Sequence, residues 1–260
     1  MLSDADRSKA ADILVEAHKT RKQAVQLSTT YPGITVEDAY AISTIVHKRA
    51  IAAGRRLIGH KVGLTSKAMQ RSSNIDEPDF GYLHDDMLIA DGAKLVHADF
   101  CKPRVEVELA FVLGKRLMGP GITLTDVLAA TDYVVPALEI VDARVQDQRK
   151  IFDTIADNGA AAGIVMGGRP VRPTDVDLRW VGGIMYKNSE IEETGLAAGV
   201  LGHPAMGVAW LANKVGAMGT ALEAGHIVLA GSFTRVVFAA KGDTVHGDFG
   251  PLGGISVQFV

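Results

Sequence analysis

The chain has 260 residues, enough for one large domain or for a domain with a helical appendage. Hydrophobic residues make up 47% of it and 28 residues are glycine, which indicates a packed, turn-rich globule rather than a disordered chain. The net charge is −3, from 27 Lys and Arg against 30 Asp and Glu, so we expect no nucleic-acid partner.

The sequence also gives expectations about compartment. No apolar run is long enough to cross a bilayer, so we expect no membrane partner. The first residues lack the basic and then apolar pattern of a secretion signal. The single cysteine, Cys101, cannot form an internal disulfide, which fits a reducing compartment. We therefore predict a cytoplasmic protein.

Two helices are predicted in the first 56 residues. Ser3 is a suitable N-cap for the first helix, and an apolar stripe follows it. Thr35 caps the second helix, with Asp38 three residues further on in the arrangement of a capping box, and Gly54 ends it. We predict that residues 1–56 form a helical cap on the rest of the chain.

From residue 57 onward, short β-like runs alternate with Gly and Pro. Helices are predicted near 123–130 and 204–215, and a hairpin tip at 187–190. Because strands dominate and helices do not alternate regularly with them, an α+β fold is favoured over a doubly wound sheet. No Walker loop or dinucleotide fingerprint is present, which argues against nucleotide binding. The predicted strands are 57–62, 104–113, 133–142, 163–167, 180–187, 226–230, 235–240, 244–248 and 255–259.

Glu106 and Glu108 stand two residues apart inside an apolar run. On a strand, alternate residues point to the same face, so the two carboxylates lie side by side opposite an apolar face. In a half-buried position they repel each other and lose hydration, and a hard divalent cation relieves both costs. A strand with one solvated face explains this pair equally well.

A third carboxylate, Glu139, is the only charge in the apolar run 134–141. A lone buried Glu is costly unless it is paired, and Arg104 or Arg144 is an alternative partner to a metal. Three Glu on two strands can build one face of an octahedral site that leaves positions open for water or substrate, which suits catalytic Mg²⁺ or Mn²⁺. No His pair with helical ligand spacing accompanies these strands, which argues against zinc.

Other candidate residues have common structural explanations. Lys61 interrupts a short strand-like run and could stabilise developing negative charge or donate a proton, or it could be a solvated strand-edge lysine. Asp79 lies between Pro78 and Gly81 in what we interpret as a rigid loop, where an Asp commonly bonds its own backbone. Arg235 joins two apolar strands and could bind a substrate carboxylate, or simply be solvated.

Together these segments resemble the hydratase/decarboxylase branch of the fumarylacetoacetate hydrolase superfamily. The resemblance covers nearly the whole chain, and the order of its segments is specific. Glu139 stands where hydrolases of the wider superfamily commonly have Asp, which is similar to the hydratase and decarboxylase pattern. The segments that carry the resemblance are GHKVGLTS at 59–66, EPDFG at 77–81, PRVEVELAFV at 103–112, PALE at 136–139 and IADN at 155–158.

The resemblance implies a mixed β-sandwich roll over residues 57–260 with N-terminal helices, and a homo-oligomer. It implies Mg²⁺ or Mn²⁺ on Glu106, Glu108 and Glu139, with Lys61 and Asp79 as the catalytic residues. The implied reaction adds water to a 2-oxo-alkenedioate, a small-molecule 2-oxo acid of aromatic meta-cleavage catabolism. We expect a cation, Arg235, to bind the second carboxylate of such a substrate.

Three alternatives remain open at this point. A decarboxylase of the same branch, acting on a 2-oxo-hexenedioate, would need the same metal and the same electron sink. A hydratase for the monocarboxylate 2-hydroxypenta-2,4-dienoate is the second alternative. The third is a non-catalytic, β-rich binding module with a structural cation, in which protein atoms would fill every metal position.

Overall fold

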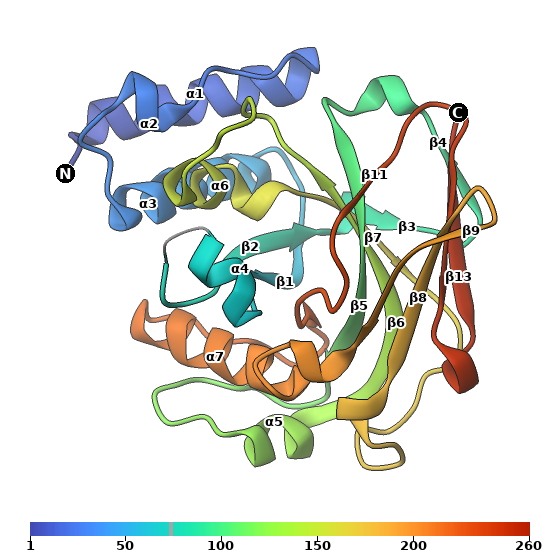
Figure 1. Ribbon diagram of the computed structural model, residues 1–260. Coiled ribbons are helices and arrows are strands. Elements are labelled where there is room, and N and C mark those ends of the chain that lie inside the picture. The colour runs from blue at the N-terminus through green and yellow to red at the C-terminus, as the bar shows by residue number, and fades with distance from the viewer. Residues whose placement is uncertain (73–74) are drawn as a thin grey trace.

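The computed structural model describes residues 1–72 and 75–260. Two curled β-sheets pack together, and helices cover one side of the larger sheet (Figure 1). The main helices are α1 (Asp4–Thr20), α2 (Leu27–Thr30), α3 (Val36–Ala52), α4 (Lys67–Ser72), α5 (Leu124–Ala130), α6 (Ile151–Ala156) and α7 (Pro204–Ala217). The strands are β1 (Leu57–Gly63), β2 (Asp79–His84), β3 (Leu88–Ile89), β4 (Ala93–Leu95), β5 (Pro103–Leu113), β6 (Thr131–Asp142), β7 (Ala161–Met166), β8 (Gly182–Lys187), β9 (Glu190–Leu196), β10 (Ile227–Leu229), β11 (Val237–Phe238), β12 (Thr244–Asp248) and β13 (Gly254–Phe259).

The larger sheet has the strand order β2-β1-β10-β5-β6-β7-β3, and β11 adds to β5; the smaller sheet has the order β4-β13-β12-β8-β9. Parallel and antiparallel pairs mix within the larger sheet, since β1 runs parallel to β10 and antiparallel to β2. The α+β prediction of a mixed, curled β-fold with N-terminal helices is therefore confirmed. All nine predicted strands are present in the part of the chain that the structure describes.

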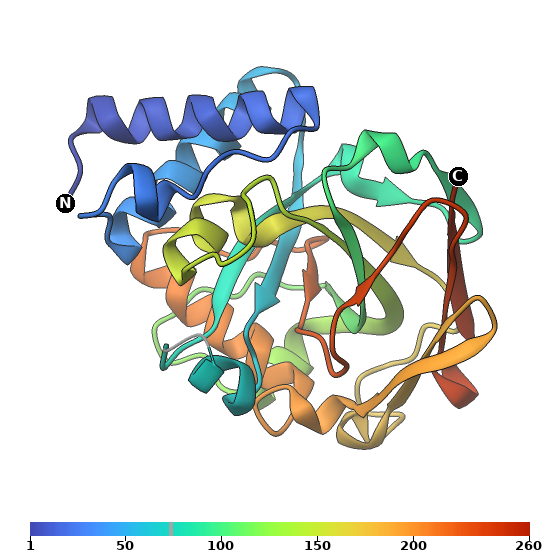
Figure 2. The ribbon, with the colours of Figure 1, turned by 45° about the horizontal axis from the view of Figure 1, so that its top comes forward.

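The N-terminal helices begin where the capping residues predict. The Ser3 side chain accepts a hydrogen bond from the Asp6 amide, and Thr35 and Asp38 form a reciprocal capping box. In Figure 2, α1 and α3 lie together at one end of the molecule, away from the smaller sheet. A single hydrophobic cluster nevertheless includes Leu14 and Ile42 from these helices with residues of both sheets. The division at residue 56 stays a prediction.

Strands β2, β3, β4 and β9 have no counterpart in the sequence prediction. β9 was missed because its burial pattern is largely exposed and it carries three Glu residues, so it shows no apolar alternation. β2 was missed because Pro78 and Gly81 indicated a loop. The loop prediction for Asp79 is wrong: Asp79 begins β2 and pairs with Gly63 of β1. Gly81 is needed there because a Cβ would lie 2.3 Å from the carbonyl oxygen of Asn158.

The pairing of β5 with β6 forms the centre of the fold. The two strands run antiparallel over the whole of β5. The odd-numbered residues of β5, Val105, Val107, Leu109 and Phe111, are all fully buried in the hydrophobic core. Their even-numbered neighbours therefore project from the opposite face of the same strand. Among the described residues, no helix has the length and hydrophobicity that crossing a membrane requires.

Candidate active site

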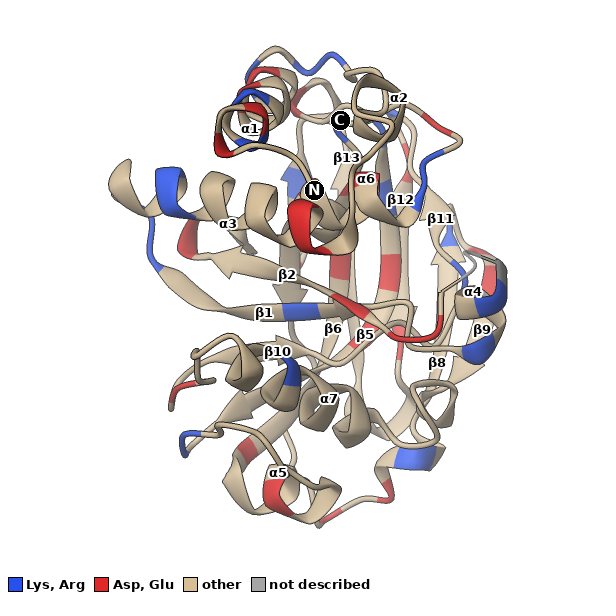
Figure 3. Ribbon diagram, turned by 90° about the vertical axis from the view of Figure 1, so that its left-hand side faces the viewer, with Lys and Arg blue, Asp and Glu red and all other residues tan. Residues whose placement is uncertain are grey.

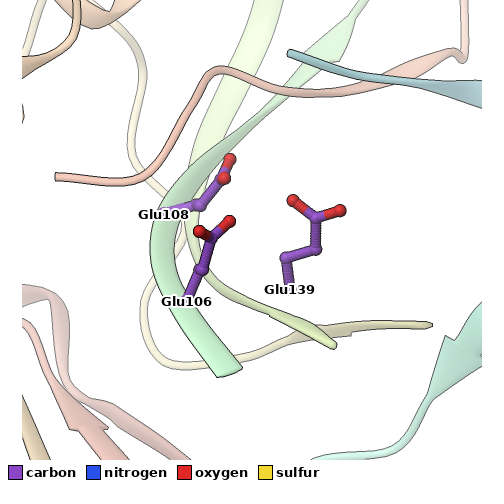
Figure 4. Close-up of side chains that lie close together, drawn as sticks. All are labelled: Glu106, Glu108 and Glu139. Atoms are coloured by element: carbon purple, nitrogen blue, oxygen red, sulfur yellow. The ribbon is translucent and has the colours of Figure 1, made fainter. Parts of the chain in front are cut away.

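The three predicted metal ligands come together on the non-core face of β5 and β6. Glu106 and Glu139 are direct cross-strand partners, and Glu108 follows two residues along on the same face. One carboxylate oxygen from each residue lies within 4.8 Å of one from each of the others. Figure 4 shows the carboxylates of Glu106 and Glu108 on one strand facing that of Glu139. In Figure 3, acidic positions, drawn in red, lie on the neighbouring strands β5 and β6 in the middle of the molecule.

In this acidic cluster (Glu106, Glu108 and Glu139), Glu106 is half-buried and the other two are buried without enough partners. Glu108 and Glu139 are 0% exposed, so the alternative of a solvated strand face is wrong for Glu108. One Glu108 oxygen accepts a hydrogen bond of 2.9 Å from the Gly231 amide, but Glu108 Oε1 and Glu139 Oε2 accept none from the described residues. Unpaired buried carboxylate oxygens are expensive.

The pKa values report the same cost. Burial raises the pKa of Glu139 to about 7, against the opposing effect of Lys61, and the neighbouring charge of Glu106 raises it further. Burial also raises the pKa of Glu106, and it raises that of Glu108 well above its usual range. Three close carboxylates, two of them buried with free oxygens, are the donor set that a hard divalent cation such as Mg²⁺, Mn²⁺ or Ca²⁺ takes. The residues present therefore fit a divalent metal.

Lys61 lies beside this cluster and not at a solvated strand edge. It is 4% exposed, and its Nζ is 3.3 Å from Glu139 Oε1. Lys61 is thus the cation that pairs with Glu139, and the alternatives Arg104 and Arg144 are wrong. Burial alone would lower the pKa of the Lys61 ammonium, but the charges of Glu139 and Asp79 outweigh burial and raise it. Lys61 therefore stays protonated at neutral pH.

Asp79 faces the same space from the neighbouring strand. It is 1% exposed, and neither of its side-chain oxygens has a hydrogen-bond partner among the described residues, so the prediction of a turn Asp is wrong. Burial raises the pKa of Asp79, while the Lys61 ammonium acts in the opposite direction. A Cβ on Gly63 would lie 2.1 Å from Asp79 Oδ1 and 3.4 Å from Lys61 Nζ. Glycine at that position leaves room for both functional side chains.

The segment after α6 packs against β1 and β2. Asn158 makes two hydrogen bonds with the Tyr82 backbone, at 2.7 Å and 2.9 Å, and so docks on β2. A Cβ on the next residue, Gly159, would be 3.2 Å from the Lys61 side chain, so this turn packs directly against it. Asp157 ends α6 and pairs with Arg144. The segment therefore holds Lys61 in place without contributing a charge to the acidic cluster.

These side chains open on a cavity of about 720 Å³, a suitable size for a small organic acid. Lys61, Asp79 and Glu106 line it. Arg235 lies at its rim, where the side chain is 82% exposed and forms an ion pair of 2.7 Å with Glu193. The structure thus brings five of the six predicted site residues together in the interior and leaves Arg235 outside that group.

Sequence reasoning missed Arg104 as a site residue. It lines the cavity, is 9% exposed, and its Nε and Nη2 atoms have no hydrogen-bond partner among the described residues. Burial lowers the pKa of its guanidinium, and the nearby charge of Arg149 acts in the same direction. A signal was available, because Arg104 precedes Glu106 by two residues and so shares its strand face.

Comparison with known proteins identifies related chains over the full length. The family model described as fumarylacetoacetate (FAA) hydrolase C-terminal matches residues 49–260. The chain is 57% identical over 257 residues to the 2-oxo-hept-4-ene-1,7-dioate hydratase of Escherichia coli, covering 96% of both chains. It is 44% identical over 249 residues to the 2-hydroxyhexa-2,4-dienoate hydratase of Comamonas testosteroni, covering 95% of this chain and 94% of that protein.

A solved structure matches the whole fold. The 4-oxalocrotonate decarboxylase from Pseudomonas putida G7, complexed with magnesium and adipate, superposes with a TM-score of 0.97. It is 32% identical in sequence, and the match covers 100% of this chain and 99% of the decarboxylase chain. The chain is therefore similar in sequence to two hydratases and in both sequence and architecture to a decarboxylase.

Proposed function

This chain belongs to the fumarylacetoacetate hydrolase family, and on that premise we propose that it is a divalent-metal-dependent hydratase that adds water to 2-oxo-hept-4-ene-1,7-dioate. The sequence predictions of this family and of a hydratase-type enzyme are confirmed by the family match and by the related hydratases. The observation that carries the proposal is the buried acidic cluster with free oxygens beside a buried Lys61, in a chain 57% identical to a hydratase for that substrate.

The proposed metal is Mg²⁺ or Mn²⁺, held by Glu106, Glu108 and Glu139. The fit of the three carboxylates and the magnesium complex of the related decarboxylase support a divalent ion. When bound, such an ion acts as a Lewis acid that polarises the carbonyl and carboxylate oxygens of a 2-oxo acid. Among the described residues, protein atoms near the cluster do not saturate its oxygens, which supports a catalytic site over a purely structural cation.

Lys61 is proposed to stabilise the negative charge that develops on the substrate as protons move along its conjugated chain. Its ammonium is buried and fixed by Glu139 and by the packing of Gly159, so it is already oriented before the substrate binds. Its raised pKa keeps it cationic at neutral pH, which suits electrostatic stabilisation better than service as a base.

Asp79 is proposed as the group that holds and transfers the proton. Its oxygens are unpaired, and burial moves its pKa upward toward the range in which a carboxyl can both take and give a proton. Overall, the hydroxyl of water is added at C4 of the substrate and a proton at C5, so one group must deliver a proton to carbon while water is activated. Asp79 and Lys61 lie on the neighbouring strands β2 and β1, and both line the cavity, so they can share these tasks.

Decarboxylation of a 2-oxo-hexenedioate is the second candidate. The observation that favours it is the TM-score of 0.97 to the decarboxylase, although the hydratase relative is closer in sequence, at 57% against 32% identity. Both reactions would use the same cluster and the same lysine. The predicted homo-oligomer and cytoplasmic location stay predictions.

The test is incubation with Mg²⁺ and a panel of 2-oxo-alkenoates, with and without a second carboxylate, while water addition and CO₂ release are measured separately. We expect a 4-hydroxy-2-oxo acid from the heptenedioate, no CO₂, and no reaction after chelation. Release of CO₂ from 2-oxo-hexenedioate, without hydration of any panel member, would replace the hydratase proposal by the decarboxylase one.

A further inference from the structure

We propose that Arg104 binds the distal carboxylate of the dicarboxylic substrate and so selects dicarboxylic over monocarboxylic 2-oxo acids. This inference rests on the proposed function and names the residue behind its substrate class. Sequence reasoning gave this task to Arg235, and the structure offers a better-placed cation.

The position of Arg104 along β5 suits this task. It precedes Glu106 by two residues and lines the same cavity, so both side chains project from one face of the strand. The step between the two positions is about 6.6 Å, because a strand rises about 3.3 Å per residue. That is roughly the span of five single bonds in an extended chain. A substrate whose 2-oxo acid head lies at the acidic cluster can therefore extend along β5 toward Arg104.

The guanidinium of Arg104 lacks the partners that its burial demands. It is 9% exposed, its Nε and Nη2 donate to nothing in the described part of the chain, and it forms no ion pair there. Among the described residues, three acids lie near enough to act on Arg104: Glu106, a proposed metal ligand, and Asp142 and Asp147, which are engaged elsewhere. Asp147 pairs with Lys102, and Asp142 accepts hydrogen bonds from the backbone amides of Cys101 and Lys102. A buried cation with unpaired N–H donors costs free energy unless an anion accepts hydrogen bonds from those donors.

The surroundings also fix the orientation of the group. The Arg104 guanidinium lies 5.2 Å from the ring centroid of Phe238, its direct neighbour on β11, so the ring supports its planar head. Arg149 lines the same cavity and adds positive charge near Arg104. A planar fork of donors in a partly desolvated pocket matches a carboxylate, which accepts two parallel hydrogen bonds.

Arg235 is less suitable for this task. Its side chain is 82% exposed and already bound to Glu193, so a carboxylate there would compete with that acid and with water. Charge pairs in solvent contribute little compared with desolvated ones. Arg235 and Arg149 therefore provide matched control positions for Arg104, since all three are arginines that line one cavity.

The experiment measures binding without turnover. Two saturated 2-oxo acids of equal length are used, 2-oxoheptanedioate and 2-oxoheptanoate, which differ only in the distal carboxylate and contain no double bond to hydrate. Their dissociation constants are measured calorimetrically with Mg²⁺ for the wild type, Arg104→Gln, Arg104→Lys, Arg149→Gln and Arg235→Ala. Circular dichroism and thermal midpoints check that each variant is folded.

We expect Arg104→Gln to weaken binding of the dioate about 10- to 100-fold, the scale of a lost hydrogen bond to a charged group. Binding of the monocarboxylate should change little, and Arg104→Lys should fall between, because it keeps the charge and loses the fork. Equal weakening for both acids, no weakening in either Arg104 variant, or a selective loss confined to Arg149→Gln or Arg235→Ala would overturn the assignment. Neither acid is turned over, so these dissociation constants test the role of Arg104 even if the hydratase assay fails.

Discussion

Two buried groups of charged side chains in this molecule differ in how fully their polar atoms are paired. The Arg144 pair consists of Arg144 and Asp157. Arg144 donates to Asp157 Oδ1 at 2.5 Å, to the Asp157 carbonyl at 2.5 Å and to the Ala161 carbonyl at 2.9 Å, and its amide donates to Asp157 Oδ2 at 2.8 Å. The acidic cluster and its neighbours Asp79 and Arg104 are as deeply buried, yet several of their atoms have no partner among the described residues.

The difference separates structural charge from functional charge. Both groups lost hydration on folding, and that cost is similar for similar groups. In the Arg144 pair each guanidinium nitrogen and both carboxylate oxygens have a partner in the protein, so the charges connect α6 to the end of β6. In the acidic cluster the missing partners must come from outside the chain. Unmet hydrogen-bonding capacity, rather than burial of charge, therefore marks the site.

The largest expected effect comes from the metal positions. Glu106→Gln keeps the shape of the side chain and removes one negative charge, so it should weaken Mg²⁺ binding and activity together. Turnover should fall about 10³-fold, since metal charge stabilisation is worth several kcal/mol and each 1.36 kcal/mol is tenfold in rate. Steady-state kinetics and Mg²⁺ titration check this.

Glu223→Gln is the matched control for that experiment. It makes the same chemical change in an exposed ion pair with Arg116, where little free energy is at stake. Its turnover and Mg²⁺ affinity should match those of the wild type. Full activity of the wild type after exhaustive chelation would contradict a metal-dependent site.

The second prediction concerns the paired group. Arg144→Met leaves the Asp157 carboxylate buried without its cation, which should lower the free energy of unfolding by about 3–5 kcal/mol. By contrast, Arg104→Met removes an unpaired cation and should leave stability unchanged or raise it. Urea unfolding of the metal-free proteins measures both. If the two variants lose equal stability, the distinction between paired and unpaired charges is wrong.

The third prediction concerns the two proposed catalytic residues. Lys61→Ala should lower turnover by about 10²-fold or more, the usual scale for a positioned acid or base, and Asp79→Asn should do so similarly. Mg²⁺ binding should survive in both variants, because neither residue is a proposed ligand. Stopped-flow measurement of the hydration step together with metal titration separates the two effects. Near-normal turnover in both variants would return these residues to a packing role.

The fourth prediction uses pH. The folded-state pKa of Glu139, about 7, lies above its usual value, so metal-free stability from this group is present at low pH and is lost as pH rises through about 7. Bound metal removes that loss. The gap between the Mg²⁺-saturated and metal-free thermal midpoints should therefore widen from pH 5.5 to pH 8, by about 2–4 °C per kcal/mol for a chain of this size.

The difference between the two midpoints also cancels an opposing effect. Burial lowers the pKa values of His18 and His47 to about 4 each, so they cost stability as pH falls below their unfolded value, with or without metal. In Glu139→Gln the gap should be small and should depend little on pH. A gap that narrows with rising pH in the wild type would show that protons and metal do not compete for the cluster.

Much of the fold and the centre of the site could be predicted from sequence. Alternation in β5 placed Glu106 and Glu108 on one face, and the apolar run around Glu139 predicted a second strand; both are local patterns, and the structure pairs the two strands. Asp79 was wrongly placed in a loop because Gly81 is required by a contact with Asn158, which is distant in sequence. Arg104 was missed because its lack of a partner depends on where Asp142 and Asp147 find theirs. Such pairing is a property of the folded chain.

The smallest expected effect is at Arg235. Sequence reasoning expects its loss to cost about 1.5–3 kcal/mol in dioate specificity if the contact is desolvated. That condition is not met in this structure, because the side chain is 82% exposed and paired with Glu193. Exposed ion pairs contribute about 0–1 kcal/mol, so Arg235→Ala should change the kcat/KM ratio of dioate to monocarboxylate by less than about fivefold. A much larger and dioate-selective loss would mean that Arg235 leaves Glu193 and turns inward when substrate binds, and the distal carboxylate would then belong to the rim rather than to Arg104.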